Sequence, residues 1–188
     1  MSGGLPQTRA VILVGFMGAG KSSVGRALAE QLGWTFEDLD ERIERRERQT
    51  VAGIFRNSGE AGFRRAENAA LKELLEELRS GSEKVIGLGG GAFVHEANAA
   101  LIEAVKIPTV FLDGGVEELW GRCKQQSEEQ GTDRPLLGSP EGFRELYEKR
   151  RPHYLRASLR QETGGKGVEE IAAELIQALG LGGGRGRS

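Results

Sequence analysis

Residues 15–22 read Gly-Phe-Met-Gly-Ala-Gly-Lys-Ser and match the pattern G-x-x-x-x-G-K-[ST] at every fixed position. In such a loop, glycines let backbone N–H groups converge on phosphate oxygens, and the N-terminus of the following helix adds partial positive charge. Lys21 would reach the β- and γ-phosphates, and Ser22 would coordinate Mg²⁺. The alternative is a set of turn glycines beside a solvated lysine. The complete pattern favours a nucleoside triphosphate site.

Two carboxylates follow the short apolar segment 34–36. Asp38 and Asp40 stand at alternate positions, so in an extended chain both would face the same side. Near a phosphate-binding loop, one could position Mg²⁺ through water and the other could accept a proton from an attacking hydroxyl. Alternatively, both belong to a surface turn that caps the next helix. A further strand-end carboxylate, Asp113, precedes Gly114 and Gly115 and is interpreted as a capping or turn residue.

Two of the adjacent arginine pairs, Arg64–Arg65 and Arg150–Arg151, are candidates for binding an anion. An arginine fork suits a planar carboxylate, because two N–H groups meet two oxygens, so an anionic co-substrate is expected. Exposed arginines on helix surfaces are the alternative. Arg134 differs because it follows a polar segment, and a mobile arginine that closes over the transferring phosphate recurs in phosphoryl transfer.

The elements that must position these residues alternate between short apolar runs and longer segments of helical spacing. This order predicts an α/β fold with a parallel sheet covered on both faces. Residues 124–133 are polar and lack periodicity, so an exposed, mobile loop is expected there. Residues 40–79 exceed what one crossover needs, and this insertion could build the second-substrate site. The expected strands are 10–14, 34–36, 85–88 and 109–112, and the expected helices include 21–32, 64–78 and 117–124.

Composition limits the classes of partner. With 188 residues the chain can bury its own core, so a single domain is expected over residues 1–188. A formal net charge of −2 provides no field of one sign to hold nucleic acid or a membrane, and neither is expected as a partner. Residues 1–8 lack the apolar core of a signal peptide, which predicts a cytoplasmic location. The only cysteine, Cys123, cannot form an internal disulfide and is expected to be buried or half-buried.

Six segments resemble those of the shikimate kinases in order and approximate spacing, and the resemblance runs from about residue 9 to residue 176. It implies an NMP-kinase-like P-loop fold with a five-stranded parallel sheet flanked by helices. The core would cover about 9–180, the substrate-binding helical region about 38–68 and the lid about 122–138, with residues 181–188 as a disordered tail. The segments are 15–22, 36–40, 63–67, 89–91, 134–137 and 149–154.

The resemblance also implies how the acceptor is held. Asp40 would bind the ring hydroxyls of shikimate and act as the general base. Arg64 and Arg150 would hold its carboxylate, and Gly90 would offer its backbone N–H, which explains glycines where other P-loop proteins have an Asp. Asp38 would support Mg²⁺ through water. Phe55, Phe63 and Glu67 match positions that line the pocket or orient its arginines.

For the nucleotide, the resemblance implies that Arg122 stacks on adenine and Arg134 contacts the ATP phosphates. The segment between these two residues is longer than in many members, and residues 163–166 lack an arginine that some members direct toward adenine. The catalytic set would be Lys21, Asp40 and Arg134. The ATP-binding set would be Gly18, Ala19, Gly20, Lys21, Ser22, Ser23, Arg122 and Arg134.

The implied reaction converts ATP and shikimate to ADP and shikimate 3-phosphate, a step toward chorismate and the aromatic amino acids. The cofactors would be ATP and Mg²⁺, and a monomer is expected. One alternative is a kinase for another small hydroxy acid such as gluconate, and a second is a nucleoside monophosphate kinase. A third is a catalytically silent nucleotide-binding module, against which Lys21, Ser22, Asp40 and Arg134 argue together.

Overall fold

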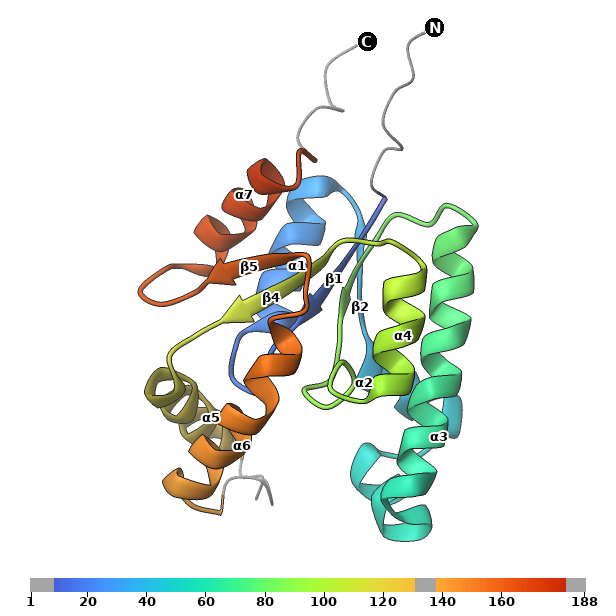
Figure 1. Ribbon diagram of the computed structural model, residues 1–188, viewed down its shortest axis with the longest axis vertical. Coiled ribbons are helices and arrows are strands. Elements are labelled where there is room, and N and C mark those ends of the chain that lie inside the picture. Colours follow the sequence, from blue (N-terminus) through green and yellow to red (C-terminus); the bar gives the residue numbers. More distant parts are fainter. Residues whose placement is uncertain (1–8, 131–137, 182–188) are drawn as a thin grey trace, which may run out of the picture.

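The computed structural model describes residues 9–130 and 138–181. Within them, five parallel strands form one sheet in the order β2-β3-β1-β4-β5, with helices on both faces (Figure 1). The predicted α/β class and the five-stranded parallel sheet are therefore confirmed. The strands are β1 (Ala10–Val14), β2 (Thr35–Asp38), β3 (Lys84–Gly87), β4 (Thr109–Asp113) and β5 (Leu159–Glu162).

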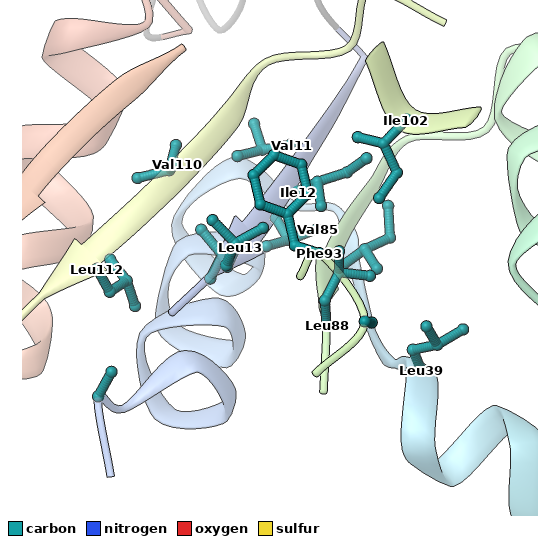
Figure 2. Packing of buried hydrophobic residues seen from close by; sticks show 14 of the residues in the cluster. Val11, Ile12, Leu13, Leu39, Val85, Leu88, Phe93, Ile102, Val110 and Leu112 are labelled. Atoms are coloured by element: carbon teal, nitrogen blue, oxygen red, sulfur yellow. The ribbon is translucent and has the colours of Figure 1, made fainter. Parts of the chain in front are cut away.

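The centre of the sheet is β1, which pairs with β3 on one side and β4 on the other. All of its side chains are buried, as expected for a parallel strand covered on both faces. Figure 2 shows Val11 and Ile12 with Val85 and Val110 of the flanking strands, and Ile102 packed over them. Because this strand is held on all sides, the loop that follows Val14 starts from a rigid base.

Seven helices connect and cover these strands in the described part of the chain. Helices α1 and α7 pack against each other, and α3 and α4 do so on the right of Figure 1. Side chains of Asp38, Thr50 and Ser139 cap three of the N-termini. The bounds are α1 (Lys21–Leu32), α2 (Leu39–Glu47), α3 (Val51–Arg79), α4 (Glu96–Ala104), α5 (Val116–Gln130), α6 (Pro140–Tyr154) and α7 (Val168–Ala178).

Helix α3 contains a sharp kink at Gly59. This residue has φ 67° and ψ −175°, a conformation outside the helical region that is essentially restricted to glycine. The kink divides α3 into a short arm, residues 51–58, and a long helix, residues 60–79. The predicted helix 64–78 is the long part, and Arg64 lies in its first turns.

One predicted loop is a helix in its described part. Residues 124–130, expected to be a mobile loop, form the last turns of α5, although the side chains of residues 124–129 are mostly exposed as predicted. Lys, Gln and Glu are good helix formers without apolar periodicity, and Gln125 donates a hydrogen bond to Glu129 one turn later at 2.9 Å. The absence of an apolar stripe was therefore misleading.

Several predicted boundaries extend beyond the described residues. The lid, about 122–138, includes residues 131–137, and most of the predicted tail, 181–188, also lies outside the described ranges. Leu181 itself is described, and it packs against the core. Across the described residues, no helix has the length and apolar character needed to cross a bilayer. The assignment of residues 1–188 to one domain stays a prediction.

Candidate active site

The loop between β1 and α1 is shaped by close packing against α5. Gly18 has φ 79°, and a Cβ placed there would lie 2.7 Å from Leu119 O and 2.8 Å from Cys123 Sγ. A side chain therefore fits neither the backbone conformation nor the space. Cys123 is buried, as predicted, directly beneath the loop. The helix that leads into the predicted lid region thus touches the predicted phosphate-binding loop.

Lys21, the first residue of α1, turns back over this loop. Its Nζ donates to Gly15 O at 2.9 Å and to Phe16 O at 3.0 Å. Burial lowers the pKa of Lys21 to about 8, and the negative charges of Asp40 and Asp38 oppose this shift. The ammonium group therefore lies among backbone groups of the loop and near two carboxylates.

Ser22 and Asp38 meet across the space between α1 and β2. The Ser22 hydroxyl donates to Asp38 Oδ2 at 3.1 Å. The other Asp38 oxygen accepts from the backbone N–H groups of Asp40 at 2.9 Å and Glu41 at 3.4 Å, so Asp38 is the N-cap of α2. The helix-cap alternative was thus correct for Asp38. It does not exclude an ionic role, because a hydroxyl and a carboxylate are oxygen donors that suit Mg²⁺.

Asp40 lies in the first turn of α2 and not in an extended segment, so the predicted strand-like alternation with Asp38 was wrong. The helical turn keeps the two carboxylates close by a different geometry. Burial raises the pKa of Asp40 to about 6, and repulsion from Asp38 and Glu67 adds to the effect, while Lys21 opposes it. A Cβ at Gly89 would lie 2.7 Å from Asp40 Oδ1, so the carboxylate lies directly against that residue.

The glycine triplet, residues 89–91, follows β3 and borders two of the predicted arginines. A Cβ on Gly91 would lie 2.9 Å from Arg64 Nη2, and a Cβ on Gly90 would lie 3.5 Å from Arg150 Nη1. None of the three glycines has a positive φ. Glycine is therefore required here for the absence of a side chain and not for its backbone conformation. Side chains from α2, α3 and α6 therefore converge on one short segment beside the phosphate-binding loop.

Arg64 is held by a buried carboxylate. Its Nη1 donates to Glu67 Oε1 at 3.1 Å and Oε2 at 2.9 Å, and Glu67 is only 1% exposed. Asn98 of α4 donates to Glu67 Oε2 at 2.9 Å, and its own amide oxygen accepts from Asn68 at 2.9 Å. Arg64 Nε is buried and has no hydrogen-bond partner among the described residues. A buried donor of this kind is available for a ligand oxygen.

The second arginine of each predicted pair lies elsewhere. Arg151 binds Asp113 Oδ2 at 2.7 Å, and Arg160 reaches the same oxygen at 2.7 Å. Asp113 is therefore a nearly buried ion-pair centre and not the capping or turn residue that was predicted. Arg65 lines a separate hollow of about 380 Å³ between α2 and α3. From each pair, only the first arginine lies beside the triplet.

The remaining predicted residues surround this centre or lie outside the described part. Phe55 is 40% exposed and stacks on Phe63 with ring centroids 4.6 Å apart. Arg122 on α5 forms an ion pair with Glu118 of the same helix. Arg134 lies outside the described residues.

Sequence reasoning missed two positions that contact this centre. Asn98 carries no motif, because a single Asn within a helix has no distinguishing signal in the sequence. Tyr154 stands in the motif segment 149–154 but received no role, although it is fully buried and its hydroxyl donates to Gly90 O. Its distance along the chain from the triplet concealed the contact.

Comparisons with known proteins agree with this geometry. A family model described as shikimate kinase matches residues 17–180. A shikimate kinase of Cereibacter sphaeroides is 40% identical over 174 residues, covering 91% of this chain and 82% of the relative. A shikimate kinase of Geobacter metallireducens is 41% identical over 174 residues, covering 91% and 92% of the two chains.

Solved structures give the same result. The shikimate kinase from Acinetobacter baumannii in complex with shikimate superposes with a TM-score of 0.79 at 34% identity, covering 91% of this chain and 92% of that one. A gluconokinase from Sinorhizobium meliloti shares the fold alone, with a TM-score of 0.57 at 18% identity over 94% of each chain. The family model and the relatives together establish that the chain belongs to the shikimate kinase family.

Proposed function

We propose that the chain transfers the γ-phosphoryl group of ATP to the 3-hydroxyl of shikimate, giving shikimate 3-phosphate and ADP. Family membership supports the activity, and one observation supports the location of the site. Asp40, Arg64 and Arg150 come from three helices and meet at the triplet, residues 89–91, next to the phosphate-binding loop. This arrangement combines one carboxylate for a hydroxyl with two guanidinium groups for a carboxylate.

The chemical step is an in-line transfer. The 3-hydroxyl oxygen of shikimate forms a bond to the γ-phosphorus as the bond to the bridging oxygen of ADP breaks. Asp40 accepts the hydroxyl proton, for which its raised pKa suits it better than an ordinary Asp. Lys21 exchanges its backbone partners, Gly15 O and Phe16 O, for phosphate oxygens. The positive charge of Lys21 offsets the negative charge of the transferring phosphoryl group, and no covalent bond of the protein is broken.

Recognition of the acid rests on Arg64 and Arg150. Glu67, itself held by Asn98, binds one side of the Arg64 guanidinium. The buried Nε remains for a ligand, and Nη2 beside Gly91 can exchange its 3.6 Å ion pair with the exposed Glu60 for a ligand oxygen. Two N–H groups on one arginine match the two oxygens of a carboxylate. We assign the acid's carboxylate to these two arginines and to the backbone N–H of Gly90.

For the nucleotide, we assign the phosphates to the backbone of residues 18–20 and to Lys21, Ser22 and Ser23, and the adenine to Arg122. Arg134 is assigned to the γ-phosphate on the family resemblance alone. Mg²⁺ would be bound by Ser22 directly and by Asp38 through water, and when bound it neutralises phosphate charge. The hydrogen bond between Ser22 and Asp38 supports this pairing.

The test is ADP release by the purified protein with Mg-ATP and shikimate, gluconate, AMP or no acceptor. Release that depends on shikimate alone is expected. Faster ADP release with gluconate or AMP would be consistent with the assigned nucleotide site but would reject shikimate as the acceptor. No stimulation by any acceptor would favour a silent nucleotide-binding module.

Arg64→Lys is expected to raise KM for shikimate by about tenfold with kcat little changed, because the charge stays but the two-pronged contact is lost. Steady-state kinetics at saturating ATP measure this effect. Arg65→Lys is the matched control, since Arg65 lies on the next position of the same helix but faces another hollow. Equal changes in KM for both variants, or none in either, would place the carboxylate elsewhere.

The pH profile of kcat/KM is expected to have two limbs. Asp40, with its pKa raised to about 6, must be deprotonated to act as a base, so the rate rises as pH increases through about 6. Lys21, with its pKa lowered to about 8, binds phosphate as a cation, so kcat/KM for ATP falls as pH rises through about 8. Rates measured from about pH 5 to about pH 10 test this, and a flat profile below pH 7 would argue against Asp40 as the base.

A further inference from the structure

A buried tyrosine reaches the glycine triplet from the far end of the chain. Tyr154, the last residue of α6, has no exposed surface, and its ring packs against Phe111 with centroids 5.4 Å apart. Its hydroxyl donates to Gly90 O, 64 residues earlier in the sequence. Because an apolar ring alone would fill the core, this hydroxyl in the interior calls for a specific explanation.

Its acceptor differs from the neighbouring carbonyls. Gly89 O accepts from the backbone of Ala92 at 3.0 Å, and Gly91 O accepts from the backbone of His95 at 3.2 Å. In the described ranges, the bond that holds Gly90 O comes from the buried phenol, with no backbone donor besides. The middle peptide of the triplet is thus oriented by a side chain.

Arg150 precedes Tyr154 by one helical turn on the same face of α6, and it borders the same glycine, since a Cβ on Gly90 would lie 3.5 Å from Arg150 Nη1. The positive charge of Arg150 opposes the effect of burial on the pKa of Tyr154. Burial dominates and raises the pKa of Tyr154 to about 12, so the hydroxyl keeps its proton and remains a donor to Gly90 O. The hydroxyl therefore holds the Gly90 peptide next to Arg150, and both groups are assigned to the acid's carboxylate.

We propose that Tyr154 is a positioning residue for acceptor recognition: its hydroxyl fixes the Gly90 peptide and the Arg150 guanidinium relative to each other, so that the carboxylate of shikimate meets both in one geometry. The inference rests on the proposed function, because it depends on these two groups reading the acid. It extends that function by naming Tyr154 as the residue that sets the position of Gly90 relative to Arg150.

The chain provides a matched control. Tyr147 is the only other tyrosine and lies two turns earlier on α6. Its hydroxyl donates to Asp113 Oδ1 and to Gly114 O, both at 3.2 Å, away from the triplet. Tyr→Phe at either position removes one hydroxyl from the same helix and keeps the ring. A purely structural hydroxyl would produce the same phenotype at both sites.

The experiment compares Tyr154→Phe and Tyr147→Phe in steady-state kinetics. Tyr154→Phe is expected to raise KM for shikimate about tenfold, the effect of one lost buried hydrogen bond, while kcat and KM for ATP stay within about twofold. Tyr147→Phe is expected to leave all three constants within about twofold. An unchanged KM for shikimate in Tyr154→Phe, or equal rises in both variants, overturns the proposal.

Binding to the wild-type protein gives a second readout that does not require Tyr154→Phe to fold. Incorporation of 3-fluorotyrosine yields two ¹⁹F resonances, and Tyr147→Phe assigns them by removing one. Shikimate added without nucleotide is expected to shift the Tyr154 resonance far more than that of Tyr147. Equal shifts, or no shift in a sample that releases ADP with shikimate, overturn the proposal. A wild-type protein that shikimate never stimulates rejects the proposed function itself.

Discussion

Asp40→Asn is expected to lower kcat by about 10² to 10⁴-fold and, at the same time, to raise the melting temperature of the protein. The rate falls because a neutral amide cannot accept the hydroxyl proton in the transition state. The stability rises because burial, together with repulsion from Asp38 and Glu67, raises the pKa of the Asp40 carboxylate to about 6. A carboxylate whose pKa is higher in the folded state destabilises that state wherever it is ionised.

The sign of the stability effect can be checked by changing pH. The unperturbed pKa is 3.8, so the charge destabilises the fold progressively above that value and fully above about 6. The gain in melting temperature from Asp40→Asn should therefore be present at pH 8 and absent near pH 3.8. Each kcal/mol corresponds to about 2–4 °C for a chain of this size.

The control for this variant is Glu41→Gln, one residue further along α2. Glu41 is exposed and forms a surface ion pair with Arg26 at 3.3 Å, an interaction of small net effect. Neither rate nor melting temperature should change much. Retention of more than about a tenth of the wild-type kcat in Asp40→Asn would remove this residue from the catalytic role.

Lys21→Met is expected to reduce turnover by about 10³-fold or more while the protein stays folded. The unbranched apolar side chain fills similar space, but it carries no charge to offset that of the transferring phosphoryl group. ADP release and thermal melting by circular dichroism measure the two properties. Lys124→Met, the same substitution at an exposed position of α5, is the control and should keep wild-type activity.

Failure of Lys21→Met to fold would indicate that the lysine has a structural role through its bonds to Gly15 O and Phe16 O. In that case Lys21→Arg, which keeps donors for both carbonyls, distinguishes the two roles. A folded Lys21→Arg whose turnover is about 10³-fold lower would show that Lys21 acts on the phosphates. Substantial activity in Lys21→Met would falsify the assignment of Lys21 to the transfer step.

The features that the sequence predicts well depend on short stretches of chain. The continuous apolar run of β1 and the glycine pattern after it predict a buried strand and a phosphate-binding loop, because each signal is complete within a few residues. The resemblance placed Asp40, Arg64, Gly90 and Arg150 in one acceptor site, and the structure brings them together beside the triplet.

The errors arise where tertiary packing decides. Asp40 was assigned to an extended segment. In the structure Asp38 is the N-cap of α2, so the helix begins at Leu39 and already includes Asp40. Residues 124–130 lack an apolar stripe, yet they continue a helix already anchored by the buried Leu119 and Cys123. Tyr154 escaped because its partner lies 64 residues away, and no local pattern predicts such a contact.

The triplet, residues 89–91, has a further consequence for inhibitors that imitate the acid. An organism usually escapes such compounds by enlarging a side chain in the pocket. Here a methyl group on Gly89 would displace Asp40, and one on Gly91 would displace Arg64, since both would approach functional atoms to within 3 Å. Resistance mutations in the triplet would therefore also reduce the enzyme's own activity. Escape mutations should instead collect in the arm, residues 51–58, where the exposed Phe55 can change without touching either group.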